Sequence, residues 1–128
     1  MTSNAGGQTI LVVDDQPDIR ELLRLQLQMK GCQVVEATNG REAVELAPQI
    51  HPSLILMDLS MPVLDGYEAT RQIHKQPRLE DVPIVAVSAY CDAHNREKAF
   101  DAGCIECVCK PIEFGMIDGL LKKHLLVQ

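Results

Sequence analysis

The sequence has few aromatic side chains. It contains two Tyr, two Phe and no Trp, so aromatic residues make up 3% of the chain. Hydrophobic residues nevertheless make up 46%, which is enough to form a core without disulfides or a structural metal. We therefore expect an aliphatic core. We also expect one domain, because 128 residues leave no room for a second of ordinary size.

Positive charge and long apolar runs are also scarce. Twelve Lys and Arg stand against 18 Asp and Glu, which gives a formal net charge of −6. Domains that bind nucleic acids normally have a basic face, because neutralising phosphates drives that affinity. No apolar run approaches the roughly 20 residues that span a bilayer, and the polar start, residues 1–9, lacks the apolar segment of a signal peptide. We expect a cytoplasmic protein without direct contacts to nucleic acid or membrane.

The cysteines raise the question of a metal site or disulfides. They are Cys32, Cys91, Cys104, Cys107 and Cys109. An odd number without a signal peptide predicts free thiols in a reducing compartment. Three cysteines within six residues could bind zinc. However, alternation along a strand places Cys104 on the face opposite Cys107 and Cys109, and no fourth ligand stands nearby. Since cysteine is also a common core residue, we favour the core interpretation.

Short apolar runs alternate with amphipathic segments along the chain. Strands are predicted at 9–14, 33–38, 53–58, 83–88 and 104–109, and helices at about 17–30, 41–47, 67–75, 92–102 and 113–126. Strands that are apolar throughout and joined by helices favour a parallel sheet covered on both faces. We expect residues 1–8 to be a flexible tail and residues 9–128 to form the domain.

Polar side chains stand where the predicted strands end. Asp14 and Asp15 follow the first strand, Asp58 ends the third, Ser88 ends the fourth and Lys110 follows the fifth. Ligands of open parallel α/β sheets bind at the carboxyl ends of the strands. All five side chains belong to that edge, so we expect them to lie close together.

These residue types suit phosphoryl chemistry. Three neighbouring carboxylates repel one another and need a cation, and oxygen ligands favour Mg²⁺. Lys110 adds a second positive charge and Ser88 a hydroxyl donor, and a carboxylate such as Asp58 can form an acyl phosphate by nucleophilic attack. Asp14 and Asp15 alone could be a helix N-terminal cap, but their combination with Asp58 and Lys110 favours a metal site.

Five motifs occur in order along the chain, spanning about residues 9–126. They are Leu11–Asp15, Leu56–Pro62, Asp65-Gly66, Val87–Ala89 and Lys110-Pro111. Together they resemble the receiver domain of two-component response regulators. The resemblance implies an α/β, flavodoxin-like, doubly wound five-stranded parallel sheet of order 2-1-3-4-5 with five helices. Asp65-Gly66 is interpreted as a turn and helix start without a chemical role.

The resemblance also implies a role for each matching residue. Asp58 corresponds to the phosphoacceptor, Ser88 to the hydroxyl that moves onto the phosphoryl group, and Lys110 to the lysine that pairs with it. The peptide bond between Lys110 and Pro111 corresponds to a cis bond. The implied ligands of Mg²⁺ are Asp14, Asp15, Asp58 and the backbone carbonyl of Ser60.

The implied function is that of a single-domain response regulator rather than an enzyme. It accepts a phosphoryl group on Asp58 from a sensor histidine kinase or phosphotransfer protein, with slow autodephosphorylation at most. We expect no effector domain after Leu126 and therefore expect the signal to pass to an unidentified partner protein or along a phosphorelay. Kinase docking is expected at the first helix, around Ile19, Leu22 and Leu23, and at the loop after Lys110.

The sequence departs from the family pattern at Cys107. Receivers usually carry Tyr or Phe there, and the ring turns inward as the hydroxyl follows the phosphoryl group. We hypothesise that Tyr90 partly takes over and, together with Ser60 at the mouth of the site, lengthens the lifetime of the phosphoryl group. The alternative is a receiver-like interaction module that does not switch. An aspartate phosphatase is disfavoured, because Ser60 stands where such enzymes carry a second Asp.

Overall fold

The computed structural model describes residues 7–59, 61 and 63–125, in which strands and helices alternate. The five strands are β1 (Thr9–Val13), β2 (Gln33–Ala37), β3 (Leu54–Asp58), β4 (Ile84–Ser88) and β5 (Glu106–Cys109). The five helices are α1 (Pro17–Met29), α2 (Gly40–Ile50), α3 (Gly66–His74), α4 (Ala93–Ala102) and α5 (Phe114–His124). None of these helices is both long and apolar enough to cross a bilayer. Of the predicted tail, residues 1–6 lie outside the described part of the chain.

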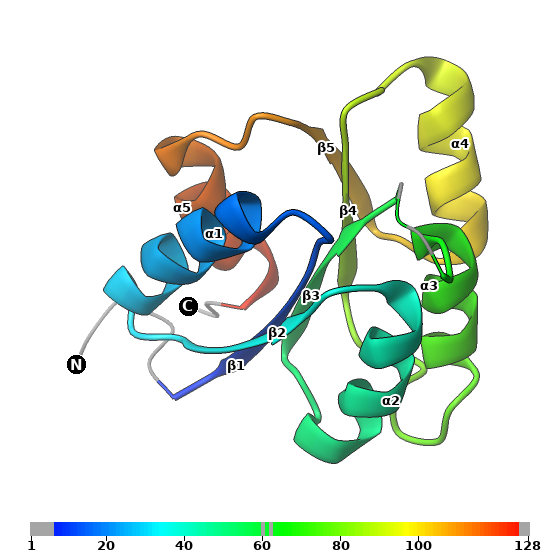
Figure 1. Ribbon diagram of the computed structural model, residues 1–128, viewed down its shortest axis with the longest axis horizontal. Coiled ribbons are helices and arrows are strands. Elements are labelled where there is room, and N and C mark those ends of the chain that lie inside the picture. Colours follow the sequence, from blue (N-terminus) through cyan, green and yellow to red (C-terminus); the bar gives the residue numbers. More distant parts are fainter. Residues whose placement is uncertain (1–6, 60, 62, 126–128) are drawn as a thin grey trace.

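All strands are parallel, and their order in the sheet is β2-β1-β3-β4-β5. Figure 1 shows α1 and α5 on one face of the sheet and α2, α3 and α4 on the other. This arrangement confirms the predicted flavodoxin-like, doubly wound α/β fold. Right-handed crossovers between parallel strands place the helices on both faces, which is why the strands are apolar along their whole length.

Alternation along the strands divides the core into two clusters of aliphatic side chains. In the central strand β3, Leu54 and Leu56 face α1 and α5, whereas Ile55 and Met57 face α2, α3 and α4. All four are buried, and burying a side chain of this size stabilises the fold by about 1.5–3 kcal/mol. A shift of one residue in register would exchange the two faces, so packing fixes where β3 ends.

Helix α2 is longer than predicted, because it continues through Pro48 to Ile50. Proline lacks the N–H that would bond to the carbonyl four residues earlier, that of Val44. The side-chain amide of Gln76 donates a hydrogen bond to this carbonyl instead (3.2 Å). The helix ends where His51 adopts a left-handed conformation and donates its N–H to the Ala47 carbonyl.

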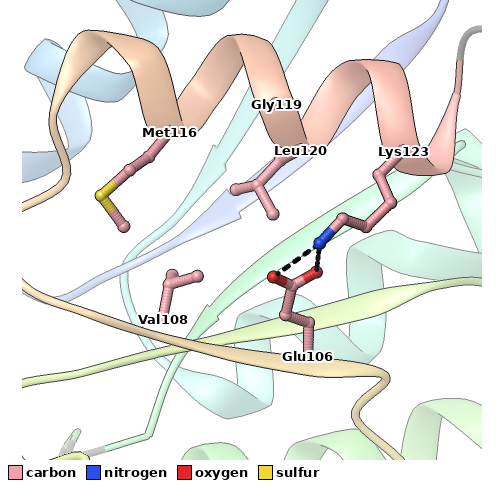
Figure 2. A pocket seen from close by; sticks show the side chains of 6 residues that line it. All are labelled: Glu106, Val108, Met116, Gly119, Leu120 and Lys123. Atoms are coloured by element: carbon pink, nitrogen blue, oxygen red, sulfur yellow. Dashed lines mark hydrogen bonds and ion pairs between the residues drawn. The ribbon is translucent and has the colours of Figure 1, made fainter.

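Helix α5 packs over β5 and leaves a groove of about 220 Å³ between them (Figure 2). The lining residues are Glu106, Val108, Met116, Gly119, Leu120 and Lys123. The Nζ of Lys123 lies 3.2–3.3 Å from both carboxylate oxygens of Glu106, which begins β5. The groove contains none of the polar residues that follow the strands, so it is separate from the predicted site.

Candidate functional site

The three predicted carboxylates come together at the carboxyl ends of β1 and β3. These strands are neighbours, and Val13 pairs with Met57, so the residues that follow each of them lie side by side. Carboxylate oxygens of Asp14, Asp15 and Asp58 all lie within 4.8 Å of one another. Asp14 is 1% exposed and Asp58 4%, whereas Asp15 faces solvent. The structure thus assembles an acidic cluster that could hold a metal ion.

Lys110 brings a positive charge to this cluster from the end of β5. Its Nζ lies 3.0 Å from Oδ2 of Asp14 and 3.4 Å from Oδ2 of Asp58. Burial lowers the pKa of Lys110, but the hydrogen bond to Asp14 and the negative charge of Asp58 outweigh burial, so the pKa is raised. Lys110 therefore remains an ammonium group at neutral pH. The peptide bond between Lys110 and Pro111 is cis, as the resemblance implied.

Contacts from the start of α1 hold Asp14 in place. Its Oδ1 accepts a hydrogen bond from the N–H of Gln16 (2.9 Å), and its backbone carbonyl accepts one from Nη1 of Arg20 (2.8 Å). Arg20 is itself fixed by Glu36 of β2 (3.0 Å). The N-cap residue of α1 is Gln16, not Asp14 or Asp15, so the acidic pair is not a plain helix cap.

Gly66 positions the end of β3, which sequence reasoning did not foresee. A Cβ atom on Gly66 would collide with the backbone carbonyl of Asp58 and lie 2.8 Å from the Cα of Leu59. Only glycine allows the first residue of α3 to approach the phosphoacceptor candidate this closely. Asp65 accepts a hydrogen bond from the N–H of Glu68 (2.9 Å) and caps the helix. The predicted turn and helix start at Asp65-Gly66 is confirmed.

Ser88 ends β4 at the same edge of the sheet and is buried. Its Oγ donates a hydrogen bond to the carbonyl of Tyr90 (2.8 Å) and accepts one from the N–H of Tyr90 (3.0 Å). The backbone N–H of Lys110 donates to the Ser88 carbonyl (2.8 Å), which ties the ends of β4 and β5 together. The hydroxyl is thus held by the loop that follows β4.

The prediction that all cysteines are free thiols was wrong for Cys91 and Cys109, which form a disulfide with a Cα–Cα distance of 5.8 Å. Cys109 pairs with Ser88 in the sheet, and Cys91 stands three residues after Ser88. The bridge forms because the loop after β4 folds back over the end of β5. The number of cysteines gives no information about which of them lie close together in the fold.

The other cysteines, Cys32, Cys104 and Cys107, are free and buried. Cys104 lies before β5 and packs in the same cluster as Cys107, so the predicted separation onto opposite faces was wrong. Burial raises the pKa of Cys104 to about 11, so the thiol is protonated at neutral pH. The core interpretation is confirmed for Cys104 and Cys107 and is wrong for Cys109, which is exposed.

Cys107, which departs from the family pattern, and Tyr90, which we expect to take over in part, lie in different surroundings. Cys107 is buried, and its carbonyl accepts a hydrogen bond from Nη1 of Arg96 in α4 (3.0 Å). Tyr90 is 68% exposed, so its ring extends into solvent. The predicted metal ligand Ser60 lies outside the described residues. Its role remains a prediction.

The comparisons with known proteins agree with this geometry. The sequence profile described as "Response regulator receiver domain" matches residues 10–122. The chain belongs to this family. The chain is a receiver domain of the two-component type, and its acidic cluster at the carboxyl edge of the sheet is consistent with a magnesium site of that family.

Two relatives and one solved structure illustrate the match. An uncharacterised 14.6 kDa protein of Leptolyngbya boryana is 38% identical, over 81% of this chain and 79% of the relative. The signal transduction histidine-protein kinase BarA of Escherichia coli (strain K12) is 36% identical, over 91% of this chain and 13% of BarA. The receiver domain of the sensor histidine kinase PA1611 from Pseudomonas aeruginosa PAO1 has a TM-score of 0.87 at 34% identity, over 93% of this chain and 98% of that chain.

That structure of PA1611 has a magnesium ion coordinated in its active-site cleft. Other curated relatives are longer than this chain, which spans 41–43% of three transcriptional regulators and 9% of the sensor protein EvgS. Receiver domains therefore occur both in regulators and in sensor kinases among the relatives.

Proposed function

We propose that this receiver domain accepts a phosphoryl group on Asp58 and passes the signal on by binding a partner protein or by phosphorelay. The observation that carries the proposal is the convergence of Asp14, Asp15 and Asp58 with the ammonium group of Lys110. The donor is a histidine kinase or a phosphotransfer protein, and related segments occur in the histidine kinase BarA and the sensor protein EvgS.

Each side chain has a defined task in the transfer. A carboxylate oxygen of Asp58 attacks the phosphorus atom, the bond from phosphorus to the donor's histidine nitrogen breaks, and the electron pair stays on that nitrogen. Lys110, 3.4 Å from Asp58, neutralises the negative charge of the arriving phosphoryl oxygens. Asp14 keeps Lys110 in place through its own 3.0 Å ion pair.

The same residues fit Mg²⁺. Three carboxylates within 4.8 Å form a set of hard oxygen donors whose mutual repulsion a divalent cation relieves. We propose as its ligands Asp14, Asp15, Asp58 and the backbone carbonyl of Ser60. When bound, the ion supplies charge neutralisation to the phosphoryl oxygens.

Ser88 is the proposed switch residue. To donate a hydrogen bond to a phosphoryl oxygen on Asp58, its hydroxyl has to give up the donation to the Tyr90 carbonyl. We propose that the loop after β4 changes conformation in this step. Because Cys107 offers no ring to follow this movement, we retain the proposal that Tyr90 takes part in it.

Partner docking is proposed on α1. Leu22, Leu25 and Met29 are exposed large hydrophobic side chains on this helix. Leu23 is buried in the core beneath α1 and cannot contact a partner. The docking surface predicted from the sequence therefore loses this residue. Ile19 is partly buried and packs against the same core cluster.

Incubation with acetyl phosphate and MgCl₂, followed by intact mass measurement, tests the proposal. We expect a gain of about 80 Da, corresponding to one phosphoryl group. The gain should be lost in Asp58→Asn and retained in Asp118→Asn, a matched change in an acid that pairs with Lys30 outside the site.

The alternative is a receiver-like module that binds partners without switching. The hydrogen bonds between the Ser88 hydroxyl and the Tyr90 backbone favour it, because they keep the hydroxyl on the loop. A lack of any mass gain, with both acetyl phosphate and a phosphorylated phosphotransfer protein as donors, would establish that alternative. A gain that persists in Asp58→Asn would contradict Asp58 as the acceptor.

A further inference from the structure

The disulfide between Cys91 and Cys109 lies beside two residues of the proposed site. Cys109 pairs with Ser88 in the sheet and directly precedes Lys110. Cys91 belongs to the loop whose backbone holds the Ser88 hydroxyl, and its Sγ lies 3.6 Å from the Ser88 carbonyl. The bridge thus connects the loop after β4 to the strand that carries the lysine.

This pair is accessible to thiol chemistry, whereas the other cysteines are not. Cys109 is exposed and Cys91 half-buried, and exposed disulfides are the ones that thiol reductants reach readily. Cys32, Cys104 and Cys107 are buried free thiols. Burial raises the pKa of all three, so little reactive thiolate forms there. Exchange with external thiols is therefore confined to the bridge.

The bridge restrains the movement that switching requires. To bind a phosphoryl group on Asp58, the Ser88 hydroxyl has to give up its donation to the Tyr90 carbonyl. Tyr90 directly precedes Cys91, which is covalently fixed to the end of β5. The covalent link therefore favours the conformation in which Ser88 stays bound to the loop.

We propose that Cys91 and Cys109 form a redox-controlled latch on the receiver site. With the disulfide formed, the Ser88 hydroxyl stays on the Tyr90 backbone, and the conformation that binds a phosphoryl group is disfavoured. Reduction to two thiols frees the loop and strengthens that binding. The inference rests on the proposed function of Asp58 as phosphoacceptor.

The opening reaction is thiol–disulfide exchange with a dithiol, either a protein of the dithiol reductase class or a small-molecule dithiol. A thiolate of the dithiol attacks Sγ of Cys109, the Cys91–Cys109 bond breaks, and Cys91 leaves as a thiolate that takes up a proton. The second thiol of the dithiol then attacks the mixed disulfide and releases Cys109. Two electrons and two protons pass to the protein, and the dithiol becomes a disulfide.

The test measures binding of beryllium fluoride with Mg²⁺, a mimic of the phosphoryl group, to the oxidised protein and to protein reduced with dithiothreitol. We expect reduction to tighten binding by about tenfold, within the usual range of coupling between two sites. By reciprocity, the mimic must favour reduction by the same factor, so the midpoint potential of the pair rises by about 30 mV per tenfold.

Two variants and one control sharpen the measurement. Cys91→Ser and Cys109→Ser should each bind the mimic as tightly as the reduced protein and should not respond to dithiothreitol. Cys32→Ala should still respond, because Cys32 packs in the cluster on the other face of the sheet. Should a serine variant fail to fold, the oxidised and reduced forms of the unaltered protein still decide the question.

The outcomes separate the two proposals. Equal affinity in the oxidised and reduced forms, or peptide mapping that finds no Cys91–Cys109 bond after treatment with oxidised glutathione, overturns the latch alone. A response to dithiothreitol that survives in Cys109→Ser also overturns it. Absence of binding in both redox forms and in both serine variants overturns the proposed function, and the latch with it.

Discussion

At the carboxyl edge of the sheet, the ends of β1 and β3 differ from the ends of β4 and β5 in what holds their side chains. In the acidic half, formed by Asp14, Asp15 and Asp58, strand register and one lysine bring the charges together. In the loop half, formed by Ser88 and the segment from Tyr90 to Cys91, backbone hydrogen bonds and a disulfide hold the hydroxyl.

The acidic half is fixed by the strands, whereas the loop half can be adjusted by changing a few contacts. Core packing determines the buried strands β1 and β3, and their register fixes where Asp14 and Asp58 lie. The loop half depends on a few local contacts, namely the hydrogen bonds of Ser88 to the Tyr90 backbone and the disulfide of Cys91. We infer that the acidic half sets whether the domain accepts a phosphoryl group and the loop half sets how the domain responds.

Removing the charge that joins the acidic half should have the largest effect. We expect Lys110→Met to slow phosphorylation by acetyl phosphate by about 100-fold or more, the usual cost of losing one group that stabilises developing charge. Lys123→Met is the matched control, because its side chain is 61% exposed and lies at the groove beside α5. The rate of mass gain measures both. Equal rates for the two variants would remove Lys110 from the site.

Gly66→Ala tests whether the backbone behind Asp58 matters to the acidic half. The added Cβ collides with the Asp58 carbonyl, so we expect a loss of about 1–3 kcal/mol in the free energy of unfolding and slower phosphorylation. Gly119→Ala places a Cβ in open space within α5 and should stabilise the fold by about 0.5–1 kcal/mol. Urea denaturation compares them, and a stable, fully active Gly66→Ala would show that the close approach is dispensable.

The ion pairs of Lys110 in the acidic half should make the stability of the protein depend on pH. The folded pKa of Lys110 is raised above its ordinary value of 10.5. Its stabilisation is therefore complete below pH 10.5 and is lost as pH rises through the folded pKa. Urea denaturation as pH rises above 10.5 should show the unaltered protein losing more stability than Lys110→Met. Parallel losses in both proteins would contradict the raised pKa.

A substitution in the loop half that leaves the disulfide intact, Tyr90→Ala, should have the smallest effect on stability. Tyr90→Ala removes an exposed ring, so we expect the free energy of unfolding to change by less than about 0.5 kcal/mol. If Tyr90 hinders water at the mouth of the site, the phosphoryl group on Asp58 should nevertheless be lost faster, which a time course of intact mass measures. Unchanged lifetime and unchanged partner affinity would end the hypothesis that Tyr90 replaces the family's aromatic residue.

The acidic half was predictable because its signals are local in sequence. Each strand is an apolar run that ends in a polar residue, and parallel strands bring such ends to one edge. The sequence therefore predicted correctly that Asp14, Asp58 and Lys110 lie together at this edge. The approach of Gly66 to Asp58 was missed, although a glycine just inside a helix that follows a site residue is a usable sign of close backbone contact.

The loop half was predicted less well, because its contacts join segments whose proximity depends on the folded loops. The pairing of Cys91 with Cys109 needs the loop after β4 to lie over the end of β5. The sequence predicted a strand from Cys104, but β5 begins only at Glu106. Gly103 caps the end of α4, and Cys104 lies in the connection between this cap and the strand. Alternation along a strand therefore did not apply to it.

The proline within α2 has a consequence for how this sequence can vary over evolution. Pro48 leaves the Val44 carbonyl without its helical donor, and the side chain of Gln76, which lies just after α3, supplies one. Neither position is informative when it is considered alone. In an alignment of descendants, we expect glutamine to persist at position 76 while position 48 is proline, and to drift freely once position 48 regains an N–H, so that the two positions are inherited as a pair.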